Sequence, residues 1–178
     1  LDNSGKKIRS LFLIRSAQIK GIPSDVYINF AFAVELFQTF TLIHDDLPQL
    51  DNDDFRRGVP SLHKKFSEDT AILSGDGLSI LTFNLFSRWT EASFHYNKGL
   101  VGFIKLFSKD TGYLLIDGQI KDMKYIHRKE NLPDEALILD IYKKKTAIFF
   151  ADVLSFGSIV TEDDYQEIYD NGINFGLA

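Results

Sequence analysis

Apolar residues recur at three- and four-residue steps over long windows of the chain, which is the spacing of one face of an α-helix. The clearest window spans residues 25–46 and repeats through Ile28, Phe32, Leu36 and Ile43. Ser24 or Asp25 is a suitable residue to cap its start. A helix of this length extends roughly 30 Å at 1.5 Å per residue.

Similar windows predict helices at 6–20, 68–88, 97–123, 134–156 and 162–177. The window from 134 begins with Pro133, Asp134 and Glu135, and acids in a first turn suit the helix dipole. The chain shows no series of alternating strands bounded by turns. We therefore predict an all-α fold of helices longer than average.

Length and composition narrow the class of protein. The 178 residues suit one compact domain, and a net charge of −5 without a basic run argues against nucleic-acid binding. The absence of cysteine excludes disulfides and thiolate metal sites. It suits a reducing compartment, so we expect the cytoplasm, with an organelle matrix as the alternative. The apolar stretches 26–44 and 147–160 are interrupted or short, so no membrane span is predicted.

The sharpest local feature is HDDLPQLDNDDFRRG, residues 44–58, with five aspartates within ten residues. A solvated loop is the simplest interpretation. However, the cluster closes a long apolar helix, at the end where the helix dipole disfavours negative charge. A calcium loop of the EF-hand type fails, because Arg56 and Leu62 stand where Gly and Glu are needed. Magnesium, held by a few carboxylates and substrate phosphate oxygens, fits better.

Asp45 and Asp51 are six residues apart, about 240° around a regular helix. They share a site only if the helix breaks between them, and Pro48 favours a break there. Arg56 and Arg57 follow this cluster, and a guanidinium group can bind two phosphate oxygens in a bidentate manner. The residues therefore predict a site for magnesium and a diphosphate.

Several motifs, in order, resemble the trans-isoprenyl diphosphate synthases, the family of farnesyl and geranylgeranyl diphosphate synthases. ELFQTFTLIHDDLPQLDNDDFRRGVPSLHKKF and AILSGDGLSILTF resemble its first aspartate-rich region, and the likeness runs from about residue 5 to the end. The resemblance implies a bundle of long helices around a central cavity. It also implies Mg²⁺, isopentenyl diphosphate and allylic diphosphates as ligands, and a homodimer.

The resemblance assigns a role to each matching residue. Lys6 and Arg9 of GKKIRS, with Gln38 and Arg57, are implied to bind isopentenyl diphosphate.

Asp45 and Asp51 are implied to ligate magnesium, with Asp46 as a weaker ligand or an orienting residue. Arg56 is implied to bind the allylic diphosphate. Asp45, Asp51 and Lys145 are implied to be catalytic.

Two later motifs also match the family. Gln119 and Asp122 belong to a G-Q-x-x-D motif and share one helix face, three residues apart. Lys145 and Thr146 match a Lys-Thr pair that resembles a second grip on the allylic diphosphate.

Product length is expected to depend on what blocks the cavity. Phe40 and Thr41 lie five and four residues before Asp45, about one helical turn away. A Phe there resembles members that make short products, so farnesyl diphosphate is favoured, with geranylgeranyl diphosphate as the alternative. A non-catalytic partner subunit and a terpene cyclase of related fold remain open.

The ends of the sequence suggest a truncated domain over residues 1–178. The chain opens without Met and stops at GINFGLA, residues 172–178, just before the place of the family's second aspartate-rich motif. We therefore expect a fragment or a partly ordered chain.

Overall fold

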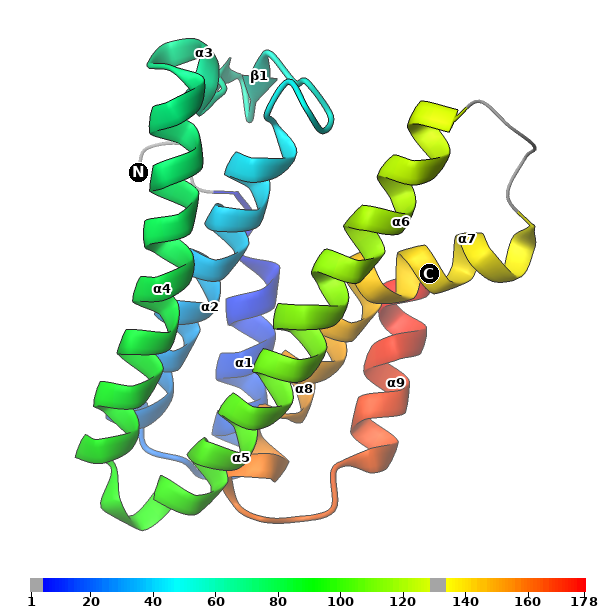
Figure 1. The fold of residues 1–178 in the computed structure, drawn as a ribbon. Helices are drawn as coiled ribbons and strands as arrows, with labels where there is room; N and C mark the ends of the chain where they lie inside the picture. The colour runs from blue at the N-terminus through cyan, green and yellow to red at the C-terminus, as the bar shows by residue number, and fades with distance from the viewer. Residues whose placement is uncertain (1–4, 129–133) are drawn as a thin grey trace.

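The computed structural model describes residues 5–128 and 134–178, and this part of the chain is helical apart from one short hairpin (Figure 1). The elements in chain order are α1 (Ile8–Ile19), α2 (Ser24–Asp45), β1 (Phe55–Arg56), β2 (Val59–Pro60), α3 (Leu62–Lys65), α4 (Glu68–Ala92), η1 (Phe94–Tyr96), α5 (Asn97–Phe107), η2 (Ser108–Leu114), α6 (Leu115–Arg128), α7 (Glu135–Tyr142), η3 (Lys143–Ala147), α8 (Ile148–Val160) and α9 (Gln166–Leu177). The predicted all-α class and all six predicted windows are confirmed.

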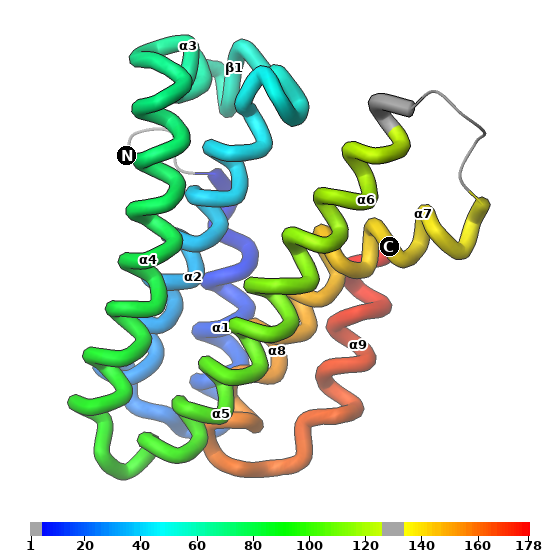
Figure 2. Tube along the Cα trace, in the orientation of Figure 1, coloured from blue at the N-terminus to red at the C-terminus, as the bar shows by residue number. Residues whose placement is uncertain are grey.

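The helices form a bundle in which α2 packs against α4 and α1, while α8 packs against α1, α5 and α9. Figure 2 shows α1, α2 and α4 together on one side of the molecule, with α6 and α9 on the other. α2 therefore lies inside the bundle, and its upper end leads into the loop that carries the aspartates.

Phenylalanine rings fill the core of the described chain. The largest fully buried side chains include Phe30, Phe37, Phe86, Phe103, Phe107, Phe149 and Phe156. Most of their contacts are edge-to-face, with ring centroids 4.8 Å apart between Phe103 and Phe156, a favoured geometry for aromatic pairs.

α2 has the length and apolar composition of a membrane-spanning helix. In this structure the apolar side chains Phe30, Val34 and Phe37 of that helix are buried against its neighbours. Its apolar character is therefore explained by its place in the core.

Two of the predicted helices contain a wide turn. The window 97–123 becomes α5, the π-helical η2 and α6, and the window from 134 becomes α7, the π-helical η3 and α8. Figure 1 shows α7 and α8 running in different directions on either side of η3. Asp134 caps α7 by accepting a hydrogen bond from Leu137 N at 2.8 Å, whereas Pro133 lies outside the described residues.

Candidate active site

The end of α2 and the loop after it bring the two expected metal ligands together. α2 ends at Asp45, and the chain turns back so that Asp51 N donates to Asp45 O at 2.9 Å. This bond satisfies a carbonyl that the end of a helix otherwise leaves without a partner. Pro48 lies inside the turn, so the break predicted between the two aspartates is present.

Asp45 is half-buried, and burial raises the pKa of its carboxyl to about 6. Lys145 lowers this pKa through its positive charge, and the neighbouring Asp51 raises it. Asp45 therefore stands in the field of a second carboxylate and of a lysine from a distant part of the sequence. A cation between the two acids would offset their repulsion.

Asp46 faces a different partner. Its buried carboxylate accepts a hydrogen bond from Arg56 Nε at 2.8 Å and forms an ion pair with Nη2 of the same arginine. Arg56 Nη2 also donates to Asp53 Oδ2 at 2.8 Å. The hydrogen bond to Asp46 raises the pKa of Arg56. Of the two roles expected for Asp46, the contacts are those of a residue that orients Arg56.

The two arginines sit on a hairpin in which Phe55 pairs with Pro60 and Arg56 with Val59. Arg57 and Gly58 form the two-residue loop, and both have positive φ, 54° and 80°. This fits the turn type that matches the twist of paired strands. Arg57 lies over Gly5, where an added Cβ would come 2.5 Å from its Cζ.

A cationic pocket of about 310 Å³ gathers the residues expected to bind isopentenyl diphosphate. Its lining contains Lys6, Lys7, Ile8, Arg9, Glu35, Gln38, Leu42, Arg56 and Arg57. Lys7 lies inside the GKKIRS motif but was given no role from the sequence, and Glu35 was not expected to line a site. Arg56 was expected on the allylic diphosphate, and here Arg56 lines this pocket.

Arg9 is the most enclosed cation of this pocket. Its guanidinium lies over the rings of Phe149 and Phe150, with centroids 4.8 and 4.7 Å from Cζ. Burial lowers its pKa to about 10, and Glu35 opposes this. Its buried Nε has no hydrogen-bond partner within the described residues. An anion would supply the missing acceptor.

An apolar pocket of about 600 Å³ lies on another side of α2. Its lining contains Phe40, Thr41, His44, Asp45, Leu50, Asp76, Ser79, Ile80, Leu115, Ile116, Gln119 and Ile120. It unites the expected chain-length residues Phe40 and Thr41 with Asp45 and Gln119. The α4 residues Asp76, Ser79 and Ile80 were missed, because a helical periodicity does not show which face lines a cavity.

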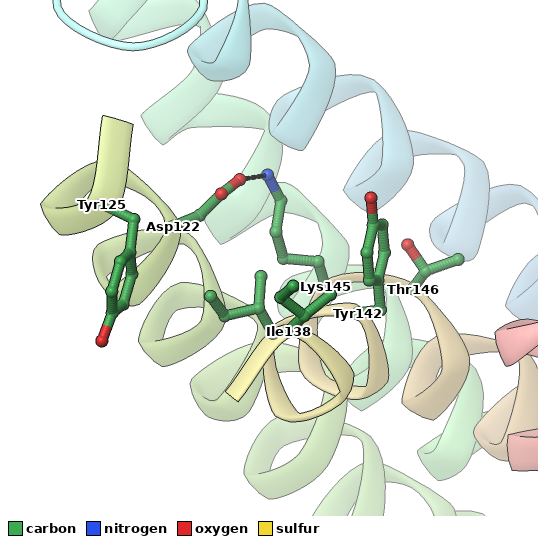
Figure 3. Close-up of a pocket in the computed structure, with 7 residues that line it drawn as sticks. Asp122, Tyr125, Ile138, Tyr142, Lys145 and Thr146 are labelled. Carbon is green, nitrogen blue, oxygen red and sulfur yellow. Dashed lines mark hydrogen bonds and ion pairs between the residues drawn. The ribbon is translucent and has the colours of Figure 1, made fainter. Parts of the chain in front are cut away.

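A third pocket, of about 420 Å³, lies where α6 meets α7 and η3. Asp122, Tyr125, Ile138, Ile141, Tyr142, Lys145 and Thr146 line it. Figure 3 shows the Lys145 ammonium directed at the Asp122 carboxylate, with which it forms an ion pair. The two expected substrate motifs, G-Q-x-x-D and Lys-Thr, thus meet across this contact.

The donor chemistry suits magnesium bound together with a ligand. Within the described ranges, no group of three or more His, Cys, Asp or Glu side chains is close enough to hold an ion. Asp45 and Asp51 offer carboxylate oxygens alone, and magnesium typically takes one or two carboxylates with substrate phosphates and water. The residues present therefore fit a magnesium–diphosphate complex better than a free ion.

Comparison with known proteins gives consistent relatives. Farnesyl diphosphate synthase of Bacillus subtilis is 33% identical over 168 residues, which cover 94% of this chain and 56% of that protein. Geranylgeranyl diphosphate synthase of Saccharolobus solfataricus is 34% identical over 181 residues, covering 98% of this chain and 51% of that protein. The chain thus spans about half the length of these curated relatives.

Solved structures have the same fold. Geranyltranstransferase of Thermotoga maritima matches with a TM-score of 0.86 and 35% identity, covering 97% of this chain and 61% of that one. A Helicobacter pylori geranyltransferase complexed with magnesium and isoprenyl diphosphate matches with a TM-score of 0.85 and 27% identity, covering 98% and 59%. The polyprenyl synthetase family model matches residues 1–178. The chain belongs to the polyprenyl synthetase family.

Proposed function

We propose that this chain forms part of a trans-prenyltransferase that condenses isopentenyl diphosphate with an allylic diphosphate. One observation carries the proposal: a cationic pocket and an apolar pocket lie against the same helix, α2, with Asp45 lining the apolar one. Such an arrangement suits two diphosphates, one with a long hydrocarbon tail. The farnesyl and geranylgeranyl diphosphate synthases among the relatives support this substrate class.

In this proposal, Asp45 and Asp51 hold Mg²⁺ with the allylic diphosphate. When bound, the metal would stabilise negative charge on the departing diphosphate. Lys145 adds a positive charge from η3, close enough to Asp45 to lower its pKa. Preorganised charges of this kind stabilise the leaving group without reorganising solvent.

Lys6, Arg9, Gln38 and Arg57 would hold isopentenyl diphosphate in the cationic pocket, with Arg56 kept in place by Asp46. The double bond of isopentenyl diphosphate then attacks the allylic cation, and a proton is lost to the released diphosphate. The apolar lining excludes water, which would otherwise quench the cation. No side-chain nucleophile takes part.

We further propose farnesyl diphosphate as the product. Phe40 is 9% exposed and lines the apolar pocket. Its ring centroid lies 5.1 Å from those of Phe37 and His44. Phe40 lies on the wall of the pocket, five residues or about one and a half helical turns before Asp45. Geranylgeranyl diphosphate is the alternative, and relatives of both kinds match the chain. A homodimer in the cytoplasm remains our proposal for assembly and location.

The test is direct. Full-length protein is incubated with Mg²⁺, isopentenyl diphosphate and each of dimethylallyl, geranyl and farnesyl diphosphate, and the products are sized by chromatography. We expect elongation that stops at fifteen carbons. Absence of elongation with every allylic substrate would support the partner-subunit alternative. Cyclised hydrocarbons formed without isopentenyl diphosphate would support the cyclase.

A further inference from the structure

Two neighbouring lysines of η3 contact α6 side by side, and the site described above uses one of them. Lys144 Nζ lies 2.8 Å from Asp117 Oδ2, and Lys145 pairs with Asp122. Gly118 lies between them: a Cβ there would come within 2.8 Å of Lys144 Cβ and 3.2 Å of Lys145 Cγ. The turn therefore straddles α6 at the glycine, with one lysine on each side.

Lys144 belongs to a closed set of four alternating charges. Lys144 Nζ lies 2.9 Å from Asp140 Oδ2, and Lys121 Nζ lies 2.7 Å from the same oxygen. Lys121 also approaches Asp117 at 3.3 Å. Asp117 and Lys121 come from α6, whereas Asp140 and Lys144 come from α7 and η3. Every member thus has a partner on the other segment.

The network is better enclosed than an ordinary surface pair. The Lys144 side chain is 16% exposed, and the other three are about one third exposed. Its hydrogen bond to Asp117 is the leading cause of the raised pKa of Lys144, and the pKa values of Asp117 and Asp140 are lowered by the two lysines. Networks with good geometry fix structure more firmly than isolated exposed pairs do.

A wide turn needs such support. π-helical turns are rare, occur mostly as single turns inside α-helices, and are frequent at functional sites. η3 carries Lys145 and Thr146 into the pocket of Figure 3. A rotation of this turn would displace the Lys145 ammonium from its position against Asp122.

We propose that Lys144 is a positioning residue that, through Asp117 and Asp140, fixes η3 on α6 and thereby places Lys145 for the allylic diphosphate. The proposal rests on the proposed function in its choice of ligand. The two adjacent lysines have separate roles in this proposal. Lys145 contacts the ligand, and Lys144 holds η3 against α6.

The experiment compares Lys144→Ala with Lys143→Ala, which removes an exposed lysine of the same turn. Calorimetry measures the binding of inorganic diphosphate with Mg²⁺ to full-length protein, and kinetics separate KM for the allylic diphosphate from kcat. We expect Lys144→Ala to weaken diphosphate binding and raise KM by about tenfold, within the range of couplings inside one ion-pair network. Lys143→Ala should match the wild type, and Lys144→Arg should recover most of the loss.

A double-mutant cycle separates positioning from general damage. In a Lys145→Ala background, Lys144→Ala should weaken diphosphate binding little further, because the lysine that Lys144 positions is already absent. Asp140→Asn, which keeps both lysines, gives a second route if Lys144→Ala fails to fold. An undiminished loss in the Lys145→Ala background, or wild-type binding by both Lys144→Ala and Asp140→Asn, overturns the proposal. A wild-type protein that binds diphosphate in this Lys144-dependent way but elongates nothing overturns the proposed function instead.

Discussion

Lys145 on η3 forms an ion pair with Asp122 on α6, 23 residues earlier in the chain, and its charge also reaches Asp45 at the end of α2. Three separate helical segments therefore converge on one ammonium group. In the proposed enzyme this group adds a positive charge where the diphosphate leaves.

Replacing Lys145 should impair substrate binding with little change in stability. Its side chain is 25% exposed, and pairs of this exposure contribute about 1 kcal/mol or less. Lys145→Ala should raise KM for the allylic diphosphate by at least about tenfold, the scale of one charge-assisted contact, while thermal unfolding stays within a few degrees. Lys124→Ala, an exposed lysine on α6, is the matched control. An unchanged KM would remove Lys145 from the substrate site.

Asp45 should govern magnesium dependence. Asp45→Asn keeps the shape of the side chain and removes the charge that a divalent ion needs. We expect apparent magnesium affinity to fall by more than the about 10- to 100-fold that loss of an outer-shell partner costs. Asp54→Asn, an exposed change in the same loop that affects an ion pair with Lys64, serves as the control. Equal magnesium titrations of the two variants would contradict the assignment.

Phe40 should limit product length. Phe40→Ala enlarges the apolar pocket five residues before Asp45, and each further methylene buried there contributes about 0.8 kcal/mol. The variant should therefore make longer products, measured by chromatography of the hydrolysed alcohols. Phe32→Ala is the matched control, because Phe32 lies on the same helix and is 56% exposed.

Phe40→Ala also removes core volume, which costs about 3–5 kcal/mol for a buried Phe. Phe40→Leu is a milder change that keeps the protein folded and should lengthen products to a smaller extent. An unchanged product profile in both variants would exclude Phe40 from this role.

Asp152 should make stability depend on pH. It is fully buried in α8, and burial, together with the nearby charge of Asp110, raises the pKa of its carboxyl well above the ordinary value. Thr111 donates to its Oδ2 at 2.6 Å, while Oδ1 has no partner in the described chain. Tyr169 from α9 donates to Asp110 at 2.8 Å, so two acids and a phenol meet here.

Because the folded protein holds this proton more tightly than the unfolded chain does, stability falls as pH rises above about 4, the ordinary carboxyl pKa. The slope from one proton is at most about 1.4 kcal/mol per pH unit. Asp152→Asn mimics the protonated form. Its free energy of unfolding, measured with urea, should therefore change less between pH 4 and 7 than that of the wild type. At neutral pH the variant should be more stable than the wild type. Glu91→Gln, an exposed change, should leave the slope intact. If the free energy of unfolding has the same pH dependence in the wild type and in Asp152→Asn, Asp152 is not the cause of that dependence.

The long helices were predictable because their periodicity extends over many turns, and Pro48 marked the end of α2. The wide turns η2 and η3 were not, since they insert about one residue into a continuing helix and leave the apolar pattern nearly intact. The hairpin of Phe55–Arg56 and Val59–Pro60 was missed because two-residue strands show no alternation.

The family resemblance predicted that Lys6, Arg9, Gln38 and Arg57 bind the same ligand, and these four residues line one pocket. It did not predict the pairings between them. That Asp46 holds Arg56, or that Lys144 joins Asp117 to Asp140, depends on how the loop and η3 close in space. Spacing along the chain indicates only the i,i+4 pair Lys144–Asp140, and it contains no information about the contacts between separate segments.

Helix α2 separates two pockets of different chemical character. Gln38 and Leu42 face the cationic pocket, whereas Phe40, Thr41 and His44 face the apolar one. In the proposed enzyme, neighbouring positions of this one helix would therefore contact two different substrates. A substitution on the apolar side of α2 would change the length of the hydrocarbon product, while the binding of isopentenyl diphosphate on the other side would stay constant.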